Sequence, residues 1–131
     1  MEMSSDSPNL DFHKYQECRD HYYKNMEEFF GRGEYRKASE LLWGAITQAI
    51  KALASLSGIR IWQHREFKSY IRDVGREKRD EEYYELFEYL ENLHRNFYDE
   101  NIDPEDFPIY LRKAKKFLEK TQTLIDEKLR E

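Results

Sequence analysis

The chain has 131 residues, of which 37% are charged and 15% aromatic, and its formal net charge is −5. This length suits one domain, and the acidic balance argues against a general nucleic-acid binder. The single cysteine, Cys18, excludes an internal disulfide and a cysteine-based zinc site. No apolar run approaches the roughly 20 residues that a transmembrane helix needs, and no signal-peptide pattern opens the chain, so we expect a soluble, cytoplasmic protein.

The N-terminal part predicts a disordered stretch over residues 1–6, followed by one helical domain over residues 7–131. Ser7 and Pro8 supply an N-cap and a first-turn proline, which together favour a helix start. Apolar residues then recur at steps of three and four. We expect this first helix to end at Gly31.

The middle of the chain predicts a long helix and a short one. Gly33 can take the positive φ that reverses the chain, and one continuous apolar stripe then covers about 34–57. Gly58 interrupts this stripe. A shorter amphipathic segment follows and is expected to end before Gly75.

The C-terminal part predicts two more long helices. One spans about 80–100, and the next begins with Asp103 as N-cap and Pro104 at its first position. No strand-like alternation is present. The fold class is therefore all-α, with four long helices and one short helix in an up-and-down antiparallel bundle.

Charge is distributed unevenly along the chain. Residues 80–106 carry eleven acidic side chains and one basic side chain, Arg95, whereas residues 51–79 carry eight basic and three acidic side chains. One interpretation is a pair of solvated helix faces. The other is a basic face over about 60–79 that meets phosphate or an acidic partner.

The segment "LHRNFY" places three polar residues side by side on the fourth helix. On a helical wheel, His94 lies on the apolar arc, Arg95 lies far from it, and Asn96 lies on the opposite flank. We interpret His94 as a core histidine that is hydrogen-bonded to a tyrosine or a backbone carbonyl. The neighbouring carboxylates, Glu91 among them, are expected on the surface.

Trp62 is the best candidate for a ligand patch. An indole can stack on a base while nearby cations hold phosphate. Two interpretations remain open: the ring covers the open end of the bundle, or it is a stacking platform. The candidate ligand-binding residues are Trp62, Arg60, His64, Arg65 and Lys68.

Other sites of chemistry are not indicated. The four histidines form no metal-binding spacing, and no glycine-rich phosphate loop is present, so no metal or cofactor is expected. Trp43 next to Gly44 on the second helix could pack against a closely approaching helix or a second subunit. We assign Trp43, Gly44 and Tyr98 to a possible dimer interface.

The stretches "GRGEYRKASELLWGAITQAIKALA" and "LHRNFYDENIDPEDF" resemble the archaeal paREP-type proteins, which belong with the HEPN (higher eukaryote and prokaryote nucleotide-binding) helical superfamily. The resemblance covers about residues 20–120. It implies a helical bundle that commonly forms a homodimer, and a nucleotide, an RNA or a nucleotidyltransferase-like protein as partner.

The resemblance also implies a possible activity. Many members of the superfamily are metal-independent ribonucleases that use an arginine, a polar neighbour and a histidine four to six residues later. Arg95 and Asn96 match the start of this motif, but Glu100, Asn101 and Ile102 occupy the histidine positions. We therefore expect a non-enzymatic binding or interaction module, with a ribonuclease using Arg95, Asn96 and His94 as the alternative.

Overall fold

The structure, a computed structural model, describes the backbone of residues 8–99 and 103–131 and the side chains of residues 11–95 and 103–131. Within these ranges all regular structure is helical, which confirms the all-α part of the predicted fold class. The five helices are α1 (Pro8–Gly31), α2 (Tyr35–Ser55), α3 (His64–Glu77), α4 (Glu81–Asp99) and α5 (Phe107–Leu129). None of the described helices has the length and apolar character needed to cross a membrane.

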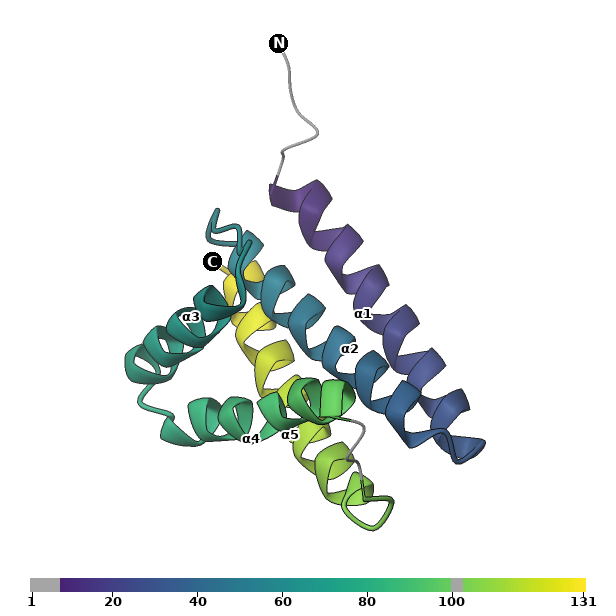
Figure 1. The fold of residues 1–131 in the computed structure, drawn as a ribbon. Coiled ribbons are helices and arrows are strands. Elements are labelled where there is room, and N and C mark those ends of the chain that lie inside the picture. The colour runs from purple at the N-terminus through teal and green to yellow at the C-terminus, as the bar shows by residue number, and fades with distance from the viewer. Residues whose placement is uncertain (1–7, 100–102) are drawn as a thin grey trace.

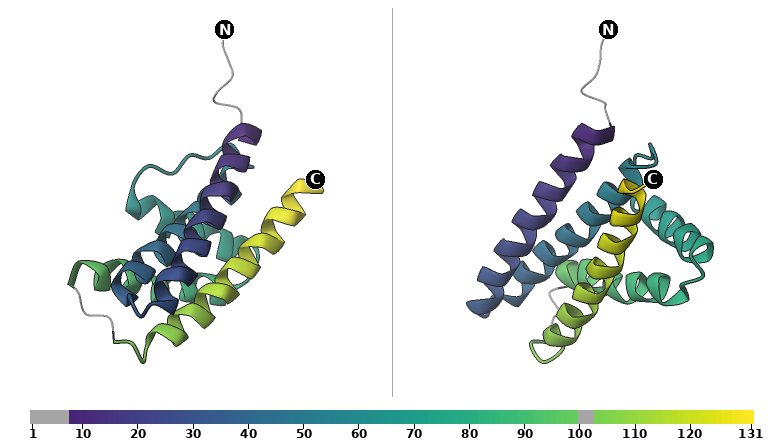
Figure 2. Two further views of the ribbon diagram at one scale, coloured as in Figure 1. Left: turned by 90° about the vertical axis from the view of Figure 1, so that its right-hand side faces the viewer. Right: turned by 180° about the vertical axis from the view of Figure 1, so that it is seen from behind.

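Helix α2 is the centre of the fold. Helix α1 packs antiparallel along it, and α5 packs against it from another side (Figures 1 and 2). Helices α3 and α4 form a hairpin, and α4 runs across both α2 and α5 at a steep angle (Figure 1). This crossing helix makes the arrangement different from the simple up-and-down bundle that the sequence predicted.

The core follows from the apolar stripe of α2. Small and branched residues alternate along it, and the alanines at 38, 45 and 49 are at most 1% exposed. Gly44 also has a packing role, because a Cβ atom there would lie 3.3 Å from a ring carbon of Tyr22 on α1. The absence of a side chain at this position lets the two helices approach closely.

Two helix boundaries differ from prediction. Helix α5 begins at Phe107 rather than near Asp103, because the Asp103 side chain accepts a hydrogen bond from the backbone N–H of Glu105 at 2.9 Å and holds a separate turn. Asp106 is the residue before the helix, and Pro108 lies in its first turn. Helix α3 continues through Gly75, which is buried at the turn into α4.

The turn between α3 and α4 carries unusual backbone geometry. Arg79 has φ 55°, and among the described residues it is the one non-glycine residue with positive φ. The backbone N–H of Asp80 donates to the carbonyl of Gly75 at 2.8 Å, and that of Arg79 donates to Arg76 at 3.2 Å. These bonds form a Schellman C-cap, a motif in which glycine is the usual residue at the position of Arg79.

We expect Arg79→Gly to raise the free energy of unfolding by about 1 kcal/mol, because glycine adopts positive φ without a Cβ clash. Chemical denaturation measures the change. The matched control is Lys78→Gly, one residue earlier, where φ is −89° and glycine should destabilise by about 0.5–1 kcal/mol. A loss of stability in Arg79→Gly would mean that the arginine side chain contributes more than its backbone costs.

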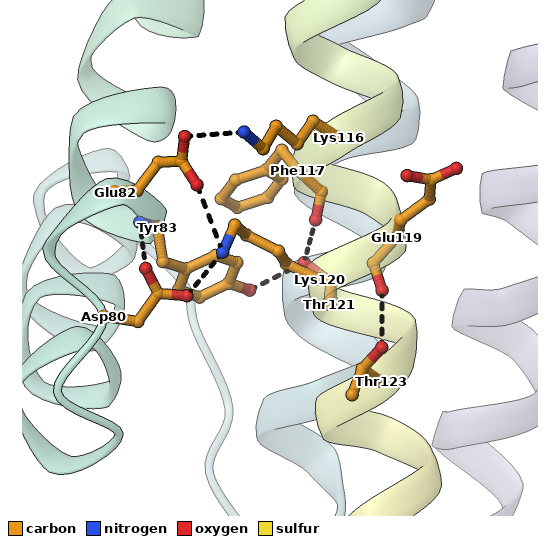
Figure 3. A network of polar contacts seen from close by, with 9 residues as sticks. All are labelled: Asp80, Glu82, Tyr83, Lys116, Phe117, Glu119, Lys120, Thr121 and Thr123. Atoms are coloured by element: carbon orange, nitrogen blue, oxygen red, sulfur yellow. Dashed lines mark hydrogen bonds and ion pairs between the residues drawn. The ribbon is translucent and has the colours of Figure 1, made fainter.

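A polar network fastens α4 to α5 (Figure 3). The hydroxyl groups of Tyr83 and Thr121 lie 2.6 Å apart inside the core, and Thr121 also donates to the carbonyl of Phe117 at 2.8 Å. At the rim, Lys120 donates to Asp80 at 2.7 Å, and this hydrogen bond raises the pKa of Lys120. The network gives the crossing helix a fixed register on α5.

Candidate functional site

The loop between α2 and α3 presents the most exposed large aromatic side chain of the described residues. Trp62 is 77% exposed, so the interpretation in which it covers the end of the bundle is wrong. The guanidinium carbon of Arg60 lies 6.0 Å from the centre of the Trp62 ring, and Arg60 also forms an ion pair with Asp11 of α1. The indole is thus held beside a cation and faces solvent.

Backbone hydrogen bonds fix the segment that carries Trp62. The carboxylate of Glu66 accepts from the backbone N–H groups of Trp62 at 2.7 Å and Gln63 at 2.6 Å. The hydrogen bonds from Gln63 and Trp62 lower the pKa of Glu66. Glu66 is the third residue of α3, a position where a glutamate commonly reaches back to cap the helix.

Next to this loop, His64 belongs to a cluster of rings between α2, α3 and α4. Its Nε2 atom lies 2.8 Å from Oε2 of Glu91, and its ring stacks on that of His94 with centroids 5.5 Å apart. The Trp43 ring contacts both histidines, at 5.9 Å in each case. We call these residues, His64, Glu91, His94 and Trp43, the histidine cluster.

His94 lies in this cluster rather than in a fully packed core. Its side chain is half-buried, and its stacking partners are Trp43 and His64. Burial, followed by the charge of His64, lowers the pKa of His94, while Glu91 opposes the shift. A neutral imidazole next to a second imidazole is the combination from which acid–base chemistry is built.

Glu91 is the residue that sequence reasoning missed. It was expected on the surface, yet it is only 7% exposed. Besides His64, its partner is Lys68, whose Nζ lies 3.9 Å from Oε1 of Glu91. The signal was available: Glu91 follows Phe87 by one helical turn and precedes His94 by three residues, so it borders the apolar arc of α4.

The remaining candidate residues are only partly brought together. Arg65 and Arg95 are exposed, as expected for Arg95 from the helical wheel. The side chains of Asn96 and Tyr98, and the whole of Glu100, Asn101 and Ile102, lie outside the described residues. The proposed pairing of Arg95 with Asn96 in a catalytic motif therefore stays a prediction.

Trp43 and Gly44 both pack against other helices of the fold. Trp43 is 8% exposed and packs against the rings of His64, His94 and Phe87. Gly44 faces Tyr22 of α1. Their assignment to a dimer interface stays a prediction, and Trp43 offers little free surface for it. Among the described residues, no group of three or more His, Cys, Asp or Glu side chains has the geometry of a metal site.

The fold and this site define a small all-helical protein with an exposed tryptophan beside a histidine cluster. A family model gives the particular assignment: the chain belongs to the archaeal PaREP1/PaREP8 family, whose model matches residues 14–118. This confirms the paREP resemblance that the sequence indicated. No curated protein and no solved structure matches the chain.

Proposed function

We propose that this chain is a non-enzymatic binding module with a HEPN-like bundle, which acts as a homodimer and binds single-stranded RNA or a nucleotide. The observation that carries the proposal is the exposure of Trp62 beside Arg60. A largely exposed indole gives a base a surface on which to stack, and an adjacent cation attracts its phosphate. Arg65, exposed at the start of α3, adds a further positive charge.

The same loop also suits a protein partner. Ile59 is 43% exposed, so the loop offers two large apolar side chains, Ile59 and Trp62, to a docking surface. A nucleotidyltransferase-like protein is the partner that the superfamily resemblance implies. RNA remains the first choice because Arg60 lies beside the ring and Arg65 is exposed three residues further along the chain.

We expect single-stranded RNA to quench tryptophan fluorescence, and its affinity to fall as the salt concentration rises, because phosphate contacts release counterions. Trp62→Ala should abolish the quenching and weaken binding measured by an independent gel-shift. Trp43 remains in that variant as an internal emission reference, since it is buried. Unchanged affinity in Trp62→Ala, or binding that salt does not affect, would contradict the proposal that RNA binds at Trp62.

A metal-independent ribonuclease is the second candidate, and the histidine cluster is the observation that favours it. In such a reaction one base takes the proton of the ribose 2′-hydroxyl, the 2′-oxygen attacks phosphorus, and an acid protonates the departing 5′-oxygen. His94, with its lowered pKa, is suited to the first role. His64, held by Glu91, is suited to the second.

Labelled RNA incubated with the protein in a chelator separates the two candidates. A ribonuclease would cleave it, and both His64→Gln and Arg95→Ala would lose the cleavage. Both variants should keep the helical signal, because the His64 side chain is 47% exposed and Arg95 is exposed. Intact RNA with a mobility shift supports the binding module instead. Cleavage that persists in both variants would point to a contaminating nuclease.

A further inference from the structure

The outer side of the α3–α4 hairpin carries two rows of opposite charge. Its side chains line a single groove of about 800 Å³ between the two helices. We call this surface the α3–α4 face. It consists of a basic row, Arg72, Arg76 and Arg79, and an acidic row, Glu81, Glu85 and Glu88.

Most of these charges have no partner among the described residues. Arg76, Arg79, Glu81 and Glu85 are exposed, and none of them forms a side-chain hydrogen bond or ion pair with the described residues. Another acidic side chain of α4 does form an ion pair: Oε2 of Glu82 lies 2.7 Å from Nζ of Lys116 on α5. Two rows of opposite sign therefore lie side by side, and four of their six charges have no partner among the described residues.

The other two members of the face are held in place. An Nη atom of Arg72 donates to the hydroxyl of Tyr84 at 2.7 Å, and its guanidinium lies 5.0 Å from the centre of that ring. Glu88 lies 3.9 Å from Lys68. The basic row also includes Arg79, which adopts the strained backbone described above in a position where glycine would cost less.

A ligand whose charges are all of one sign does not fit this face. A phosphate or a nucleic acid would satisfy the arginines but would lie beside three carboxylates, and a cation would meet the opposite difficulty. A partner must present both signs in matched rows. The chain itself carries such rows.

We propose that the α3–α4 face is the surface through which two copies of this chain bind each other. A two-fold axis that lies in the contact plane, parallel to the hairpin, places each basic row opposite the acidic row of the second copy. An axis perpendicular to the hairpin would instead oppose like charges. The proposal rests on the homodimer of the proposed function, and it names the face and its symmetry.

The geometry assigns three contacts, each made twice. Because the axis is parallel to the helices, positions along the hairpin are preserved, so Arg79 faces Glu81 of the second copy, and Arg72 faces Glu88 of the second copy. Arg76 and Glu85 meet between them. The groove of each copy gives the long arginine side chains of the other copy room to enter. Charge pairs of this kind determine orientation and choice of partner more than affinity.

Charge reversal on one row and then on the other tests the proposal. Mass is measured by light scattering at low salt for the full chain and for two double variants, Arg76→Glu with Arg79→Glu and Glu81→Arg with Glu85→Arg, which reverse the two sides of the same two contacts. The expected result is a wild-type dimer and two monomeric variants. An equimolar mixture of the variants should form a dimer again, because each then opposes the other's sign.

A matched control keeps the same charge change away from the face. Lys24→Glu with Lys115→Glu, both lining a separate groove between α1 and α5, should leave the dimer intact. Melting of each variant establishes that it is folded. High salt should weaken the wild-type dimer, because the paired charges are near solvent.

Three results would overturn the proposal, and they differ in what else they reject. A monomeric wild-type chain rejects both this face and the homodimer of the proposed function. A dimer that survives both double variants rejects this face and leaves the homodimer standing. Monomeric variants whose mixture stays monomeric reject the matched pairing of the rows.

Discussion

Replacing Tyr83 by alanine will lower the free energy of unfolding by about 3–5 kcal/mol, the usual cost of removing a buried aromatic ring. Tyr83 is 1% exposed and stacks on Phe117 with ring centroids 4.6 Å apart and planes 6° apart. Its removal would leave a cavity where α4 crosses α5. The hydroxyl of Thr121 would also lose its hydrogen bond to Tyr83. Denaturant unfolding followed by circular dichroism measures the loss.

Tyr83→Phe is the matched variant, because it keeps the ring and removes the hydroxyl group. The expected loss is about 1 kcal/mol, the typical contribution of one buried hydrogen bond. Thr121 keeps its bond to the carbonyl of Phe117, which limits the cost. Equal and small effects of the two substitutions would mean that α4 is not docked on α5 through this ring.

The sequence predicted the helices well and their arrangement poorly, and the reason is physical. Periodicity shows which face of a helix is apolar, so the buried stripe of α2 and the break at Gly33 follow from local patterns. It does not show the angle at which two helices cross. That angle depends on contacts such as Tyr83 with Thr121, which lie 38 residues apart in the chain.

The candidate site likewise has features that the sequence predicted and features that only the structure shows. The residue types around Trp62 could be chosen from the sequence, but its exposure depends on how the loop leaves α2. His94 was placed on the apolar side correctly, whereas its neighbour His64 comes from a different helix, 30 residues earlier. Contacts between distant segments, including Glu91 with His64, needed the structure.

Replacing His94 by alanine is expected to lower the free energy of unfolding by about 1–3 kcal/mol at slightly alkaline pH, because the ring fills space between Trp43 and His64. His21→Ala on the outer face of α1 is the control. His21 is exposed, and its side chain hydrogen-bonds to Asn25 one turn along the same helix, so its change should stay within about 0.5 kcal/mol. A neutral His94→Ala would mean that the ring does not pack as described.

The effect of His94 must also depend on pH. Burial and the charge of His64 lower its pKa from the ordinary value of 6.5, so the unfolded chain binds this proton more tightly than the folded chain. Stability is therefore independent of this group above about pH 6.5 and falls as the pH drops below that value. Unfolding curves taken between pH 8 and about pH 5 measure the slope.

His94→Ala removes this source of pH dependence, and the difference between the wild type and the variant should shrink as the solution becomes acidic. Glu91 raises the pKa of His94, so the Glu91→Gln variant should lose stability more steeply with falling pH than the wild type does. Identical slopes for the wild type and His94→Ala would place the titrating group elsewhere. A shrinking difference would establish that His94 is neutral near pH 7, the state that either a stacking role or a role as base requires.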